Sequence, residues 1–147
     1  MALEGFTFAF DYEPGGDFSE WLARTEAHRL GRSLAPERVA STFELAIAGG
    51  QIAGRLSVRH ALNEFLLQQG GHIGYGVLPT FRGQGLGKRM LQRGRELTAS
   101  MGIGRVLVTC DENNAASRRI IEGAGGVYES SHVGSGATPP IRRYWFG

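Results

Sequence analysis

Apolar and polar residues alternate over several stretches of the chain and recur at helical spacing over others, which predicts a mixture of strands and helices. Alternation over 42–48 predicts one strand, and alternation over 52–58 predicts a second. Only Gly49-Gly50 separates the first alternating stretch from the start of the next. Two glycines suit a tight turn between antiparallel strands, so this region predicts a β-hairpin.

The N-terminal region predicts a strand followed by a helix. A first strand is expected over 7–10, and the Pro-Gly-Gly stretch that follows ends it. Asp17 and Glu20 then form a capping-box-like pair, and apolar residues at helical spacing begin with Phe18 and Trp21. We therefore expect a helix from Phe18 that ends near Gly31.

From residue 61 the pattern alternates between connectors, strands and helices. The expected elements are a connector over 61–69, strands over 73–77 and 106–110, helices over 85–100 and from Asn114 to 123, a strand that starts at 127, a surface loop over 130–140 and a strand over 141–146. Leu86, Met90, Leu91 and Leu97 form the expected buried stripe of the longer helix. Asn114 is expected to cap the shorter helix.

Length and composition favour one globular domain over residues 1–147. At 147 residues the chain has the usual size of a single core, and 41% hydrophobic residues are too many for a disordered protein. The element order predicts an α/β (α+β) fold with a mixed sheet. No apolar run reaches the ~18 residues of a membrane span, and the N-terminus lacks a secretory leader pattern, so we expect a cytoplasmic protein without a membrane partner.

Charge and cysteine content narrow the function classes. The net charge is only +2, although basic residues cluster over 82–95, and an anionic ligand explains that cluster more simply than nucleic acid does. Cys110 is the only cysteine, so the chain can form neither an internal disulfide nor a cysteine cluster for a metal. We expect Cys110 to be a core residue, and we expect no metal cofactor.

The segment 82–88, Arg-Gly-Gln-Gly-Leu-Gly-Lys, carries the main chemical signal. It connects an expected strand to an expected helix, so several backbone amides would point the same way at the positive end of the helix dipole. Glycine side chains leave room for an anion, and Arg82 and Lys88 add charge. The spacing fits neither a Walker A loop nor a dinucleotide fingerprint. A purely structural tight turn is the alternative.

These residues resemble the GNAT acyltransferases. Arg82-x-x-Gly85-x-Gly87 is similar to the pyrophosphate-binding element of that family, with Val77-x-Pro79 before it, and 109–126 resembles the segment whose asparagine, here Asn114, contacts pantetheine. The resemblance implies a mixed sheet that splays into a V, with acyl-CoA in the split. The implied acetyl-CoA contacts are Val77, Arg82, Gly83, Gln84, Gly85, Leu86, Gly87, Lys88 and Asn114.

The implied reaction is direct attack of an amine on the thioester within a ternary complex. Holding both reactants together can supply about 7–11 kcal/mol, so no single residue needs to dominate. The family's usual proton donor, a tyrosine seven positions after the asparagine, is replaced by Ile121. Tyr128 and Tyr144 are the candidate substitutes, although a packed position in the sheet is the simpler interpretation of each. A thiolate leaves readily, so loss of this acid is expected to be tolerable.

One residue is a candidate general base, and a cluster of neighbouring residues is a candidate for the acceptor side. His72 lies nearest to the place where relatives use a strand glutamate, and a histidine near pH 6.5 suits a general base, although a hydrogen-bonded strand histidine is the alternative. Arg59 and Asn63, with His60 between them, are candidates for substrate binding or for a solvated hairpin end.

The sequence leaves the function open between two classes. The leading hypothesis is an N-acetyltransferase that acts on a small-molecule or peptide amine. A non-catalytic acyl-CoA sensor is the rival, because Ile121 replaces the usual acid. Nucleic acid is not expected as a partner, and family resemblance suggests a homodimer through the terminal strands.

Overall fold

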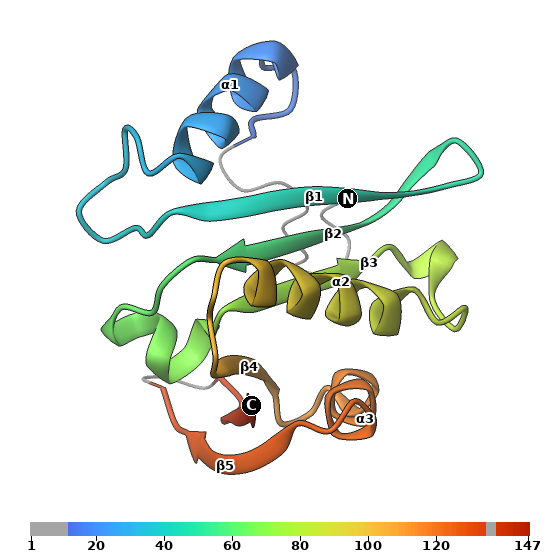
Figure 1. Ribbon diagram of the computed structural model, residues 1–147. Helices are drawn as coiled ribbons and strands as arrows, with labels where there is room; N and C mark the ends of the chain where they lie inside the picture. The colour runs from blue at the N-terminus through green and yellow to red at the C-terminus, as the bar shows by residue number, and fades with distance from the viewer. Residues whose placement is uncertain (1–11, 135–137) are drawn as a thin grey trace.

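A computed structural model describes residues 12–134 and 138–147 of the chain (Figure 1). Within these residues, six strands form one mixed sheet in the order β1-β2-β3-β4-β6-β5. Helix α1 lies on one side of the sheet, and helices α2 and α3 lie on the other side (Figure 1). This arrangement confirms the predicted mixed α/β architecture. The strand expected over 7–10 lies outside the described residues.

The predicted hairpin is confirmed. Strands β1 (Ser41–Ala48) and β2 (Gln51–Arg59) pair antiparallel, with Phe43 opposite Ser57. Both turn glycines have positive φ, 57° at Gly49 and 77° at Gly50, a conformation that other residues adopt only at a cost. The hairpin therefore forms where alternation and turn chemistry agree.

Helix α1 (Phe18–Arg29) begins where the capping residues predict. The Asp17 carboxylate accepts hydrogen bonds from the amides of Ser19 and Glu20, which satisfies two donors of the first turn. Trp21 of α1 is buried against Phe43 of β1, with the two rings perpendicular and their centroids 5.5 Å apart. This aromatic contact packs α1 onto the β1 and β2 part of the sheet.

Helices α2 (Leu86–Ser100) and α3 (Ala115–Gly123) cover the opposite face and enclose the main core. Met90 and Leu91 are buried as predicted, whereas Leu86 and Leu97 are only partly buried. Gly94 completes the buried stripe instead, because a Cβ there would lie 2.8 Å from the Ile73 side chain. The close approach of α2 to the sheet thus depends on a residue that a search for apolar side chains overlooks.

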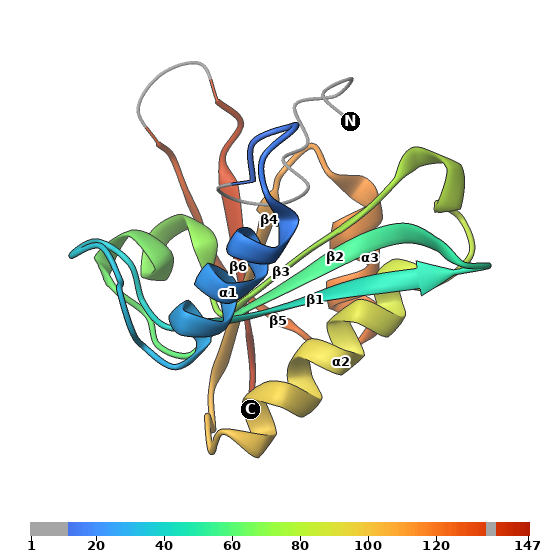
Figure 2. The same ribbon diagram turned by 90° about the horizontal axis from the view of Figure 1, so that it is seen from above.

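Strands β3 (Ile73–Val77) and β4 (Val106–Asp111) are the parallel pair of the sheet, and they pair only at Ile73 and Val108. Beyond this point the two strands diverge (Figure 2), whereas β4 pairs along its whole length with the antiparallel β6 (Ile141–Phe146). The sheet is therefore divided into two wings that meet near Ile73.

The remaining connections differ in detail from the prediction. Strand β5 (Val127–His132) pairs with β6 beyond a bulge between Tyr128 and Ser130, so the expected loop over 130–140 begins too early. The connector over 61–69 contains a short π-helix, Leu66–Gly70, that packs against β4 and β6. No helix in the described part of the chain is long and apolar enough to cross a membrane.

Candidate functional site

The divergence of β3 from β4 leaves main-chain groups of β3 without a strand partner on that side. Hydrogen bonds to β2 run from the Arg59 amide to the His72 carbonyl and from the Leu78 amide to the Ala53 carbonyl. Because hydrogen-bonding direction alternates along a strand, Tyr75 and Val77 direct their amides and carbonyls toward β4. At Val77 the strands have already separated, so its N–H faces the split, and its contact with pantetheine stays a prediction.

Among residues 12–134 and 138–147, the start of α2 has no side-chain cap. Its N-cap is Gly85, with φ of 78°, and no side chain of these residues bonds the first-turn amides, whereas Asp17 caps α1 and Asn114 caps α3. The space around Gly83 and Gly85 is open to at least 4 Å from where a Cβ would stand. Uncapped amides beside open space at the positive end of a helix form a site that suits an anion.

The charged and polar side chains of this turn are exposed. Gln84 and Lys88 are exposed, and Leu86 is partly buried as the first residue of α2. Arg82 is exposed too, but its Nε donates to the Val77 carbonyl at 3.1 Å. Arg82 thus ties the turn to the end of β3 and lies between the two predicted parts of the acetyl-CoA site.

Gly87 has a different role from the one its place in the motif suggests. It is buried, and a Cβ there would lie 2.9 Å from Ile120 Cδ1 and 3.5 Å from the Tyr75 ring. The absent side chain therefore makes room for α3 and β3, and not for an anion. Its amide still belongs to the uncapped first turn of α2.

Asn114 is the N-cap of α3, as predicted. Its Oδ1 accepts a hydrogen bond from the Ser117 amide at 3.1 Å, so the side-chain oxygen is engaged within the fold. The Nδ2 group has no hydrogen bond within the described part of the chain. The predicted contact with pantetheine stays a prediction, and the amide group is the donor available for it.

Tyr75 extends from β3 toward α3, and its hydroxyl donates to Ser117 Oγ at 3.4 Å. Burial raises the pKa of Tyr75 above its ordinary value, so the phenol keeps its proton at neutral pH. Sequence analysis did not single out this pair, because the two residues lie 42 positions apart. The structure thus brings a protonated hydroxyl to the part of β3 that borders the split.

The other candidate acids have structural contacts. Ile121 is fully buried in the core, and Tyr144 is fully buried, with its hydroxyl donating to Glu122 Oε1 at 2.7 Å and accepting from Arg142 Nε. Tyr128 is half-exposed on β5, hydrogen-bonded to Ser131. These contacts favour the expected packed position for Tyr144 and give neither tyrosine a place at the split.

His72 is buried where β3 meets β4. Its Nδ1 accepts a hydrogen bond from the Leu107 amide at 2.9 Å, which places the proton of the neutral ring on Nε2. Burial, with a smaller contribution from Arg59, lowers the pKa of His72. A neutral ring with Nδ1 occupied has no lone pair left to accept a substrate proton. The geometry therefore favours the structural alternative over the predicted general base.

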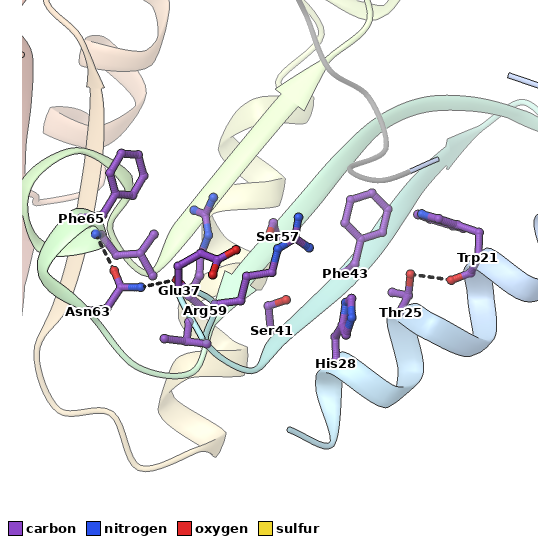
Figure 3. A pocket seen from close by; sticks show the side chains of 13 residues that line it. Trp21, Thr25, His28, Glu37, Ser41, Phe43, Ser57, Arg59, Asn63 and Phe65 are labelled. Carbon is purple, nitrogen blue, oxygen red and sulfur yellow. Dashed lines mark hydrogen bonds between the residues drawn. The ribbon is translucent and has the colours of Figure 1, made fainter. Parts of the chain in front are cut away.

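A cavity of about 520 Å³ lies on the α1 side of the sheet. Aromatic side chains from α1, β1 and the connector after β2 line it, namely Trp21, Phe43 and Phe65 (Figure 3). Both predicted acceptor residues, Arg59 and Asn63, also line it. The sequence indicated the polar side of this cavity but missed its aromatic wall, because Trp21 and Phe43 meet only through tertiary packing.

Of the acceptor candidates, Asn63 and His60 are held by the fold. Asn63 Nδ2 donates to the Glu37 carbonyl at 2.8 Å and its Oδ1 accepts from the Leu66 amide at 2.9 Å (Figure 3). His60 Nε2 is 2.8 Å from Thr42 Oγ1. Arg59 alone of the three presents several donors toward the cavity.

Cys110 behaves as the expected core residue. It is buried within the main hydrophobic cluster, and burial raises the pKa of its thiol to about 11, so it is not a thiolate at neutral pH. Among the described residues, no three His, Cys, Asp or Glu side chains are grouped so that they could hold a metal ion.

Comparison with known proteins identifies the family. A model described as the acetyltransferase (GNAT) domain matches residues 8–127. No curated protein sequence matches the chain. Solved structures do match: yncA, a putative acetyltransferase from Salmonella typhimurium with its cofactor acetyl-CoA, is 19% identical over 95% of this chain and 79% of its own length, with a TM-score of 0.64.

Two further structures support the fold assignment. The ribosomal-protein-S5-alanine acetyltransferase from Vibrio fischeri is 15% identical over 92% of this chain and 77% of its own, with a TM-score of 0.66. RimL, a ribosomal L7/L12 alpha-N-protein acetyltransferase in complex with CoA, is 21% identical over 87% of this chain and 69% of its own length, with a TM-score of 0.63. Since the family model spans most of the described residues, the chain belongs to the GNAT acetyltransferase family.

Proposed function

We propose that this GNAT acetyltransferase transfers an acetyl group from acetyl-CoA to a primary amine by direct attack within a ternary complex. The observation that carries the proposal is the pairing of the uncapped α2 start with the adjacent divergence of β3 from β4. The similar structures support both substrates, because yncA was crystallised with acetyl-CoA and RimL is an alpha-N-protein acetyltransferase.

The residues at the turn fit the pyrophosphate of CoA. The amides over 83–88 supply donors that no side chain in the described part of the protein caps, and the open space at Gly83 and Gly85 admits phosphate oxygens. Arg82 and Lys88 add positive charge beside them. The Val77 amide and the Asn114 amide group would hold the pantetheine arm across the split between the two wings.

The cavity on the α1 side would receive the amine. When bound, acetyl-CoA supplies an activated acyl carbon. The amine nitrogen forms the new C–N bond as the C–S bond breaks, and the sulfur takes the bonding electrons. The nitrogen then loses one proton to solvent and the sulfur gains one. Because the chain holds both reactants, positioning is its main contribution to the rate.

Tyr75 is the side chain best placed to protonate the sulfur. Ser117 lies one turn of α3 before Ile121, which holds the position of the family's usual tyrosine. The Tyr75 hydroxyl occupies that region from the opposite side, 3.4 Å from Ser117 Oγ. We assign it the role of proton donor that the usual tyrosine has in the family.

A paired binding and turnover experiment tests this function. Calorimetry should show acetyl-CoA binding, and a thiol-release assay with a panel of primary amines should show amine-dependent turnover. Binding without turnover on any amine would favour the acyl-CoA sensor. Absence of binding in a folded protein would remove the proposed acetyl-CoA site altogether.

A further inference from the structure

The lining of the acceptor cavity combines an apolar wall with an internal cation. Trp21 and Phe43 form the wall beneath α1, and Arg59 and Ser57 extend from the same face of β2 (Figure 3). A volume of about 520 Å³ is in the range of small-molecule sites, which bury most of a ligand of that size.

The Arg59 guanidinium lies across the neighbouring strand. A Cβ at Gly74 of β3 would lie 3.0 Å from Arg59 Nη1, so the absence of a side chain at Gly74 lets the guanidinium rest on β3. Strand β3 is the one that borders the split. Arg59 therefore brings its charge from the cavity toward the proposed reaction site.

Most of the hydrogen-bonding capacity of Arg59 is not used within the described residues. Its one side-chain hydrogen bond runs from Nη1 to the Gly70 carbonyl at 3.3 Å, and none of the ion pairs there includes it. A guanidinium has five N–H donors. Burial lowers the pKa of Arg59, a sign that its charge is poorly solvated.

Neighbouring charges add to this positive potential. Arg55, four residues earlier on the same face of β2, has a pKa lowered to about 10 by burial and by the nearby charge of Arg59. Glu37 is the one acid among the described residues that line the cavity, and no ion pair joins it to Arg59. A buried cation of this kind is stabilised when an anion hydrogen-bonds to it.

We propose that the acceptor is a small primary amine that also carries a carboxylate, which Arg59 binds while the apolar part of the amine packs against Trp21 and Phe43. This inference rests on the proposed acetyl transfer and names its substrate class. A hydrophobic amino acid has this chemistry. A carboxylate is the natural partner because it accepts two parallel hydrogen bonds from one guanidinium.

The test uses two pairs of amines that differ only in charge. L-phenylalanine and L-phenylalaninamide place the carboxylate or its neutral amide beside the amine, and 4-(aminomethyl)benzoate and 4-(aminomethyl)benzamide place it across a ring. Thiol release should give a kcat/KM at least tenfold higher for the anionic member of one pair. In Arg59→Gln, that preference should fall to within about threefold, while acetyl-CoA affinity stays unchanged.

Within a pair, the two amines differ in basicity, but this difference is the same for wild type and Arg59→Gln. Comparing the preference of the two proteins therefore cancels it. Arg59→Lys should keep part of the preference, since it retains the charge without the bidentate fork. Arg93→Gln is the control, because it removes the same charge from an exposed ion pair on the opposite side of the sheet. This variant should keep the full preference for the anionic amine. Gly74→Ala, which displaces the guanidinium, should reduce the preference without removing the cation.

Calorimetry with the same amines measures binding without turnover. If Arg59→Gln fails to fold, wild type and Gly74→Ala still test the inference. Wild type should bind the anionic member of one pair more tightly, and Gly74→Ala should weaken that binding. Acetyl-CoA turnover without any preference for the anion would overturn the inference and leave the proposed function intact. Lack of acetyl-CoA binding would contradict the proposed acetyl transfer. The amine titrations would then still test, separately, whether Arg59 binds a carboxylate.

Discussion

His72 and Leu107 join β3 to β4 through two hydrogen bonds, from the Leu107 amide to His72 Nδ1 at 2.9 Å and from the His72 amide to the Leu107 carbonyl at 2.8 Å. The two strands diverge shortly beyond this junction. The imidazole therefore fixes the point from which the split opens.

We predict that His72→Asn keeps turnover within about threefold of wild type, because Asn Oδ1 can replace Nδ1 as the acceptor. His72→Ala should lose about 1–3 kcal/mol of unfolding free energy, since it leaves a buried amide unsatisfied. Thiol release and urea unfolding measure the two effects. A drop of about 100-fold in turnover for His72→Asn, at unchanged acetyl-CoA affinity, would instead support a general base.

The lowered pKa of His72 predicts a pH dependence of stability. The unfolded chain titrates this histidine near pH 6.5, above the pKa in the folded state, so below pH 6.5 the unfolded state binds more protons. Stability should therefore fall as pH decreases from 6.5 to the folded-state pKa. His72→Asn should show a shallower decline in melting temperature. His60, whose pKa is also lowered, is present in both proteins and cancels in the comparison.

Gly85 and Gly102 provide a matched test of the acetyl-CoA site. Both have φ near 77°, at 78° and 76°, and neither has an atom within 4 Å of where a Cβ would stand. Asparagine tolerates this conformation, so each substitution should cost little stability. Gly85→Asn should weaken acetyl-CoA binding at least tenfold, about 1.4 kcal/mol, because its side chain occupies the phosphate path. Gly102→Asn, beyond the other end of α2, should leave binding unchanged. Equal affinities in calorimetry would show that the turn is not the site.

Ile121 lies in the core and not at the split. It is fully buried, and a Cβ at Gly126 would lie 2.7 Å from its Cγ2. Ile121→Tyr should therefore lose about 1–3 kcal/mol of unfolding free energy through overpacking. Ile121→Leu keeps the volume and should cost less in the same urea experiment. A tyrosine variant as stable as wild type would mean that this part of the core has spare room.

Local signals predicted the elements well. The hairpin, the capped start of α1 and the start of α2 each follow from residues close together in sequence, and all appear within one or two residues of their predicted limits. The motif around Gly85 likewise identified the family. These features are encoded locally, by alternation, capping and turn chemistry.

Contacts between distant segments could not be predicted in the same way. The meeting of Trp21 with Phe43, and the close approach that Gly87 allows to Ile120, depend on how elements pack. His72 shows the same limit, because its position in the sequence suggested chemistry and its partner Leu107 lies 35 residues away. The sequence therefore predicted part of the polar and glycine residues of the candidate site, but it did not predict the aromatic residues that line its cavity.

The hydroxyl of Tyr75 provides the sharpest test of the proposed mechanism. Tyr75→Phe removes the proposed proton donor and keeps the ring that packs beside Gly87. The turnover number should fall about tenfold, less than the roughly 10²–10⁴-fold usual for a general acid, because a thiolate with a pKa near 8.5 needs little assistance. Acetyl-CoA affinity in calorimetry should not change.

Ser117→Ala separates a donor from the residue that orients it. If Ser117 only holds the phenol in place, its loss should cost less than that of Tyr75, and the double variant should be no slower than Tyr75→Phe alone. Tyr128→Phe removes a half-exposed hydroxyl on β5 and should leave the rate unchanged. A folded Tyr75→Phe protein with the wild-type turnover number would exclude this hydroxyl as the donor and leave protonation of the sulfur to solvent.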